Sequence, residues 1–189
     1  MEPAVKKRRI PKPMTPRRLR NITMYYLEQR TTTRGNLRRV LMNRIRKSLY
    51  HHEGDEAEMA GWVDTLLDQL VQQGLINDRA WATSRMNRLL RQGQSARAIR
   101  SKLLQKQVSP ELIDELLAQA APDPLAGAAK AMKRRGIGCF REPHRQGDPK
   151  KDLAKLVRAG FSYDIARRAL SLEEDEALEL VWSLRDANY

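Results

Sequence analysis

Residues 103–117 read LLQKQVSPELIDELL, and residues 156–170 read LVRAGFSYDIARRAL. Aligned at an offset of 53 residues, the two stretches place apolar residues on apolar residues and Ser109 on Ser162. Each predicts a helix end, a turn and a second helix, because serine favours the N-cap position and apolar residues then recur at helical spacing. A hairpin of this size cannot bury its apolar face alone, so its recurrence predicts a stacked helical repeat. The matched apolar pairs are Leu103 with Leu156, Val108 with Phe161, Leu112 with Ile165, Leu116 with Ala169, and Leu117 with Leu170.

Helical spacing extends outward from this repeat and is continuous from Pro16 onward. Two apolar stripes are separated by the polar break at residues 31–33, and a third, which contains Trp62, is closed by Gly74. The next helix is predicted to start at Asn77 or Asp78. Later helices are expected to start near Ser95, Ser109, Asp123-Pro124, Pro149 and Ser162, with breaks at Gly93, Gly136 and Gly160.

These boundaries predict an all-α fold built from tandem three-helix-bundle repeats. The three units are expected at 16–74, 75–121 and 122–172, stacked into an elongated body. Residues 1–15 are rich in basic residues and proline and are expected to form a disordered arm. Residues 173–189 are expected to form an acidic C-terminal tail. A monomer is expected, because the repeats use every apolar stripe.

The composition is that of a globular protein with a strongly charged surface: 41% of the 189 residues are hydrophobic and 31% are charged. No run approaches the roughly 18 apolar residues of a membrane span, and the N-terminus has no apolar signal core. We therefore expect a cytoplasmic protein that does not enter a membrane.

Catalytic, metal and cofactor sites are not expected. Cys139 is the single cysteine, and His51, His52 and His144 lie in polar connectors, so the chain offers neither a disulfide nor a good zinc ligand set. Phosphate-binding loops, nucleophile elbows and paired carboxylates in an apolar setting are not found in the sequence. The protein is therefore predicted to act by binding and not as an enzyme.

The net charge of +13 is unevenly distributed. Residues 1–50 hold fifteen Lys and Arg against two acids, and further basic blocks cover 79–106 and 130–168. Such blocks supply phosphate contacts that are independent of base sequence and sensitive to salt, so nucleic acid is the expected partner. A nuclear import signal is a weaker interpretation of Lys6 to Arg9. The acidic stretches between the basic blocks are 53–68, 111–123 and 173–186.

Over about residues 16–171 the chain resembles the RecX family, the regulators of the bacterial RecA recombinase. One of the features that carry the resemblance is Asp78, Trp81 and Ala82 in the family's Asp-x-x-aromatic-Ala arrangement. The matching stretches are YLEQRTTTRGNLRRVL at 26–41, GLINDRAWATSRM at 74–86, RQGQSARAIRSKLLQKQVSPELIDELL at 91–117 and RAGFSYDIARRAL at 158–170.

The resemblance implies a curved body of helical repeats that lies in the groove of the RecA filament on single-stranded DNA. It also implies inhibition of strand exchange, of ATP hydrolysis and of co-protease activity, and so a role in recombination, DNA repair and the SOS response. The arm at 1–15, the connector at 136–148 and the tail from Glu173 are not set by the repeat pattern.

The first two helices of each predicted unit are basic, and the third helix of units one and two is acidic. We therefore expect a basic stripe and an acidic stripe, with the basic one facing the filament or its DNA. Trp62 and Trp81 are expected in the core and not as base-stacking platforms. The predicted contact residues are Arg34, Arg38, Arg39, Arg97, Arg100, Lys102, Lys150 and Lys151.

Two alternatives involve DNA without RecA. Residues 95–117 are two helices joined by a short turn, as in a helix-turn-helix protein that reads double-stranded DNA. The second of these helices carries Glu111, Asp114 and Glu115, which repel phosphate, although Arg167 and Arg168 keep this alternative open in the third unit. The other alternative is an architectural or single-strand-binding protein, which would bind bare DNA well.

Overall fold

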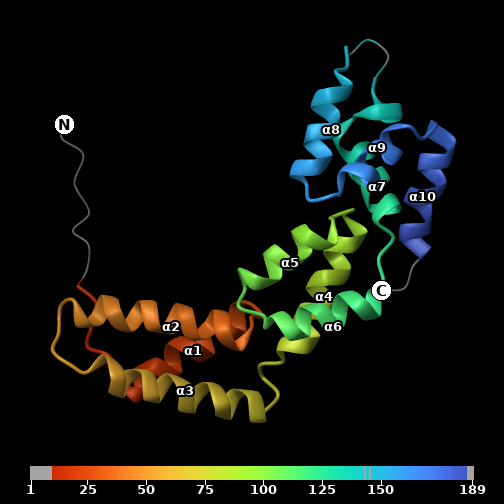
Figure 1. The fold of residues 1–189 in the computed structure, drawn as a ribbon. Coiled ribbons are helices and arrows are strands. Elements are labelled where there is room, and N and C mark those ends of the chain that lie inside the picture. The colour runs from red at the N-terminus through yellow and green to blue at the C-terminus, as the bar shows by residue number, and fades with distance from the viewer. Residues whose placement is uncertain (1–9, 143, 145, 187–189) are drawn as a thin grey trace, which may run out of the picture. The chain divides into compact units, whose positions relative to one another are not determined.

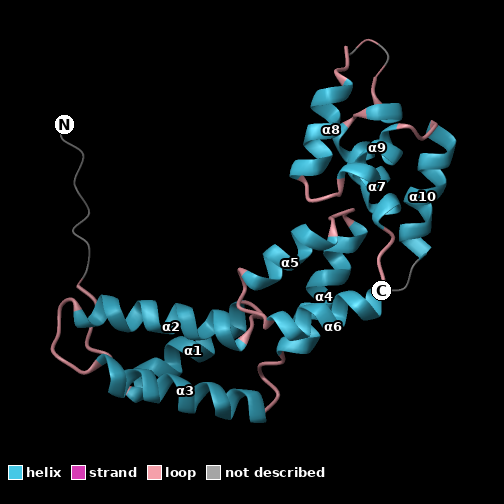
Figure 2. Ribbon diagram, in the orientation of Figure 1, coloured by secondary structure: helices cyan, strands magenta, loops and turns pink. Residues whose placement is uncertain are grey.

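The computed structural model of the protein describes residues 10–142, 144 and 146–186. Within these residues the chain forms α-helices and one short 3-10 helix and contains no strand (Figures 1 and 2), which confirms the predicted all-α class. The helices fall into two compact units, residues 1–78 and 79–189, and each is described here by itself. None of the described helices is both long enough and apolar enough to cross a membrane.

Unit one is a three-helix bundle whose first helix begins at Pro16 and whose second begins directly after residues 31–33, both as predicted. Each begins at a side chain that accepts a hydrogen bond from a backbone N–H of the first turn: Thr15, Thr33 and Asp55. Pro16 occupies the first position of its helix, where its fixed φ favours helix formation and a backbone donor is not needed. The helices are α1 (Pro16–Gln29), α2 (Arg34–Leu49) and α3 (Glu56–Gln72).

The core of unit one lies along one side of α2. Leu37, Leu41 and Ile45 recur every four residues on that side and are fully buried against apolar residues of α1 and α3, including Leu19 and Leu67. Trp62 packs against the same cluster, as expected. Position and orientation of α2 are therefore fixed by its apolar face, and its cations are left on the two flanks.

Unit two covers most of the region in which the second and third repeats are predicted. Its third-helix caps reproduce the sequence repeat: Ser109 and Ser162 each accept a hydrogen bond from the backbone N–H three residues later. Of the matched apolar positions, Leu103, Val108 and Leu116 are buried, and so are their counterparts, while the last pair is partly buried in both copies. The helices are α4 (Asp78–Arg91), α5 (Ala96–Leu104), α6 (Pro110–Ala120), α7 (Pro124–Arg135), η1 (Gly138–Phe140), α8 (Pro149–Arg158), α9 (Tyr163–Leu170) and α10 (Glu174–Asp186).

Within unit two, the loop between α4 and α5 contacts α7 and the end of α8 closely. The Ser95 hydroxyl accepts from the N–H of Ala98 and donates to the carbonyl of Ala159, 2.7 Å away. Gly93 has φ +67°, and a Cβ there would lie 2.6 Å from the Cβ of Lys130. Glycine is required here for two reasons: the backbone is left-handed, and α7 leaves no space for a Cβ.

The segment expected as an acidic tail begins with a packed helix. Ala177, Val181 and Leu184 of α10 are buried, the first two together with Ala129 of α7. Trp182 is on the outer side of α10 and is about half exposed. Residues 187–189, and residues 1–9 of the expected N-terminal arm with Lys6 to Arg9, lie outside the described part of the chain.

Candidate nucleic-acid interface

Two of the predicted contact residues in unit one are engaged by carboxylates of α3. The Arg34 guanidinium lies 2.7 Å from a carboxylate oxygen of Asp68. Arg38 donates two hydrogen bonds to Asp64, at 2.7 and 2.9 Å, the bidentate geometry that suits a guanidinium and a carboxylate. The hydrogen bond from Arg38 is the main reason that the pKa of Asp64 lies below its ordinary value. The Arg34 and Arg38 guanidinium groups therefore each already have an anionic partner on α3.

The same side of α2 carries a third ion pair and one unpaired cation. Arg46, which was not among the predicted residues, lies 2.7 Å from a carboxylate oxygen of Glu56. Arg39 is exposed and donates to the side-chain oxygen of Asn36 at 2.8 Å, and it has no carboxylate partner among the described residues. Of the three predicted cations on α2, only Arg39 keeps its charge without an acidic partner.

Asp78, the first residue of the Asp-x-x-aromatic-Ala arrangement, has a structural role. Its carboxylate accepts a hydrogen bond from the backbone N–H of Arg34 at 2.7 Å. That N–H is the first of α2 and has no partner within the helix, and the carboxylate also lies near the positive end of the helix dipole. Asp78 therefore fixes the start of the helix that carries the basic residues of unit one.

In unit two, the predicted residues of α5 have different partners. Arg100 forms an ion pair with Asp114 of α6, while Lys102 donates to the side-chain oxygen of Gln94 at 2.9 Å. Arg97 is exposed, and among the described residues it has no acidic partner. The acidic helix of this repeat therefore neutralises part of the charge of its basic neighbour, as α3 does in unit one.

Lys150 and Lys151 lie in the first turn of α8. Their backbone N–H groups donate to Asp148, the N-cap, and the Lys151 ammonium is 3.7 Å from the same carboxylate. The next residue, Asp152, is in the same first turn, is buried and forms ion pairs with Arg141 and Lys155. A single acid that bridges two cations in this way ties the connector before α8 to the helix.

Four cations that the sequence interpretation missed form a cluster in unit one: Lys12, Arg18, Arg44 and Lys47. They line a cleft of about 470 Å³, and in the described part of the chain none of them has a carboxylate partner. A helical projection at about 100° per residue could have separated Arg44 and Lys47 from the opposite flank that holds Arg34 and Arg38. The ion pairs that Arg34 and Arg38 form with acids of α3 could not have been predicted from the projection.

The single cysteine lies in an environment that disfavours a reactive thiolate. Burial raises the pKa of the Cys139 thiol, and the carboxylates of Glu174 and Glu173 raise it further. This environment is the reverse of the electropositive surroundings that activate a nucleophilic cysteine.

Comparison with known proteins gives consistent results. The family model described as the second three-helix domain of RecX matches residues 77–117. The regulatory protein RecX of Myxococcus xanthus (strain DK1622) is 35% identical over 164 residues, which are 85% of this chain and 88% of that protein. The RecX proteins of Chromohalobacter salexigens and Agrobacterium fabrum are 30% and 24% identical, over 58% and 86% of this chain and over 70% and 86% of their own lengths. No solved structure matches the chain.

Proposed function

We propose that this chain, which belongs to the RecX family of regulatory proteins, is a negative modulator of the RecA recombinase. The observation that carries the proposal is the similarity to the Myxococcus xanthus regulatory protein, which extends over most of both chains. Tandem helical repeats with basic flanks are the structural counterpart of that similarity, because stacked repeats offer an extended binding surface.

The proposed mode of action is binding in the groove of the RecA filament on single-stranded DNA. Such a groove exposes DNA phosphates together with protein surface of both signs. The chain offers exposed cations that have no acidic partner among the described residues, such as Arg39 and Arg97. Binding there would block filament growth or favour disassembly, and so would lower strand exchange, ATP hydrolysis and co-protease activity.

The experiment that tests the proposal is a titration of this protein into RecA that is hydrolysing ATP on single-stranded DNA. We expect inhibition at amounts well below one molecule per RecA subunit, because a protein that stops filament growth affects many subunits. Inhibition only at one or more molecules per subunit would contradict this mode of action. Unchanged ATP hydrolysis together with tight binding to bare DNA would favour a DNA-binding protein that acts without RecA.

A further inference from the structure

We propose that the cleft between the N-terminal segment with α1 and the neighbouring flank of α2 binds the phosphodiester backbone of single-stranded nucleic acid. We call this cleft the basic cleft; it is lined by Lys12, Arg18, Arg44 and Lys47 together with smaller polar and apolar residues. The inference rests on the proposed function only for the source of the strand, which would be the DNA of the filament.

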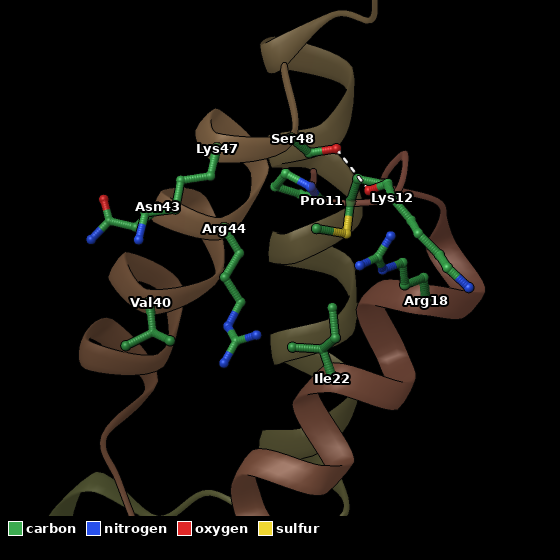
Figure 3. A pocket seen from close by; sticks show the side chains of 10 residues that line it. Pro11, Lys12, Arg18, Ile22, Val40, Asn43, Arg44, Lys47 and Ser48 are labelled. Carbon is green, nitrogen blue, oxygen red and sulfur yellow. Dashed lines mark hydrogen bonds between the residues drawn. The ribbon is translucent and has the colours of Figure 1, made fainter. Parts of the chain in front are cut away.

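The shape of the cleft suits a chain of small anionic units. Its volume of about 470 Å³ lies within the range of about 300–1,000 Å³ that holds small ligands. Figure 3 shows Arg18 and Arg44 reaching into the gap from opposite sides, with Ile22 and Val40 further along the two helices. A backbone that enters the gap would meet cations on both walls and apolar surface between them.

The charge of the cleft is uncompensated. No carboxylate is among the described residues that line it, whereas Arg34, Arg38 and Arg46 on the other flank of α2 are each paired with an acid of α3. Cations held together without acids repel one another, and a polyanion relieves that repulsion while it releases its own counterions. The cleft therefore gathers four cations, none of them paired with an acid among the described residues, where an anionic chain can reach them.

The wall that carries Lys12 is held in place by hydrogen bonds. Nε2 of His52 lies 2.7 Å from the carbonyl oxygen of Pro11, and since a carbonyl only accepts, this nitrogen carries the hydrogen. The Ser48 hydroxyl donates to the carbonyl of Lys12 at 3.2 Å, and Met14 is buried in the core of the unit. His52 and Ser48 are thus positioning residues for the wall.

Backbone recognition is favoured over base recognition. The described residues that line the cleft include no aromatic ring on which a base could stack, and Asn43 is the only side-chain amide among them. Contacts between cations and phosphates do not depend on base identity. We expect a single strand to fit the cleft better than a duplex, because a duplex is wider and its two backbones are held apart by the paired bases.

The test uses the full chain and a fluorescently labelled oligothymidylate, with affinity measured by anisotropy over a range of salt concentrations. The cleft variant is Arg44→Gln with Lys47→Gln. The control variant, Arg34→Gln with Arg38→Gln, removes two charges from the opposite flank of the same helix. Thermal unfolding followed by circular dichroism checks that both variants fold, which is expected because Arg44 and Lys47 are exposed and Arg34 and Arg38 are half-buried with their charged ends at the surface. Competitors are inorganic phosphate, polyglutamate and a duplex of equal length.

We expect the cleft variant to bind at least about tenfold more weakly at about 0.15 M salt. Its slope of log affinity against log salt should fall by about 1.4, because each lost contact to a single strand removes about 0.7. The control should keep the slope and bind within about twofold of the wild type, since its cations are already neutralised.

Equal losses in the two variants would overturn the inference, because net charge alone would then explain binding. The inference would also be overturned if inorganic phosphate displaced the strand at an equal concentration of phosphate groups. The same holds if the cleft variant bound polyglutamate more weakly but bound oligothymidylate as the wild type does. RecA is absent from this assay, so failure here leaves the proposed function standing. If the wild-type protein bound the strand but did not inhibit RecA, the proposed function alone would be contradicted.

Discussion

The two flanks of α2 both carry cations but differ in what surrounds them. Towards α3, Arg34, Arg38 and Arg46 each meet a carboxylate of the neighbouring helix. Towards α1, Arg44 and Lys47 meet further cations and no acid among the described residues. The α3 flank keeps one cation, Arg39, without an acidic partner among the described residues, whereas on the α1 flank neither Arg44 nor Lys47 is paired with an acid. Whether a helix can bind a polyanion therefore depends on what the adjacent helix contributes.

The largest expected effect, on the free energy of unfolding, comes from truncating a core side chain of α2, because the core face lies between the two flanks. Leu37→Ala deletes a fully buried side chain from the core face of α2 and should lower the free energy of unfolding by about 2–5 kcal/mol. Urea denaturation followed by circular dichroism measures this. Val71→Ala, at an exposed position on α3, is the control and should change the free energy by no more than about 0.5 kcal/mol. A loss below 1 kcal/mol for Leu37→Ala would show that α2 is not held by this face.

Charge reversal should separate the two flanks most clearly in binding. Arg44→Glu with Lys47→Glu should weaken oligothymidylate binding by about 3 kcal/mol, since each charged hydrogen bond contributes at least about 1.5 kcal/mol, and this is roughly a hundredfold in affinity. Arg34→Glu with Arg38→Glu changes the net charge equally, and its effect should be several times smaller. Anisotropy at fixed salt measures both, and a larger loss on the α3 flank would reverse the comparison.

A smaller effect is expected when a wall of the basic cleft is released without changing a cation. His52→Ala removes the hydrogen bond to Pro11, with an expected cost of about 0.5–1.5 kcal/mol, and frees the segment that carries Lys12. The salt slope of strand binding should fall by about 0.7, the value of one lost contact. His51→Ala changes an exposed neighbour and should leave the slope unaltered. Equal slopes in the two variants would show that the hydrogen bond does not position Lys12.

The smallest effect is expected on the paired flank itself. Arg38→Ala should lower the free energy of unfolding at pH 7 by no more than about 1 kcal/mol, because the pair with Asp64 is largely exposed. The folded pKa of Asp64 is below its unfolded value, so this contribution is complete above the unfolded value near about 4 and is lost as pH falls through the folded one. Urea denaturation between pH 7 and 3 should show the difference between variant and wild type shrinking, and a constant difference would mean that the ion pair is not its source.

Features that depend on neighbouring residues in the sequence could be predicted from the sequence. The caps Ser109 and Ser162 and the buried pair Leu103 and Leu156 follow from local hydrogen bonding and helical spacing, and the structure confirms them. The packed helix α10 was not predicted, because acidic residues dominate the segment. Its packing depends on a few apolar residues, which include Ala177 and Val181.

The pairing of charges could not be predicted in the same way. Arg38 meets Asp64 across 26 residues of chain, and Arg34 meets Asp68 across 34. These pairs depend on the relative register of α2 and α3, which the core side chains set and no local pattern records. The basic cleft likewise requires α1 and the segment before it to lie beside α2, a tertiary arrangement that hydrogen bonds such as that from Ser48 to Lys12 hold.

The most direct test of the account is RecA-catalysed ATP hydrolysis on single-stranded DNA with three proteins titrated in parallel. These are the wild type, the cleft variant Arg44→Gln with Lys47→Gln, and the control Arg34→Gln with Arg38→Gln. The account predicts that wild type and control inhibit at amounts well below one per RecA subunit, and that the cleft variant needs roughly tenfold more, in line with its loss of strand contacts. Inhibition by the cleft variant at the wild-type amount would contradict the account.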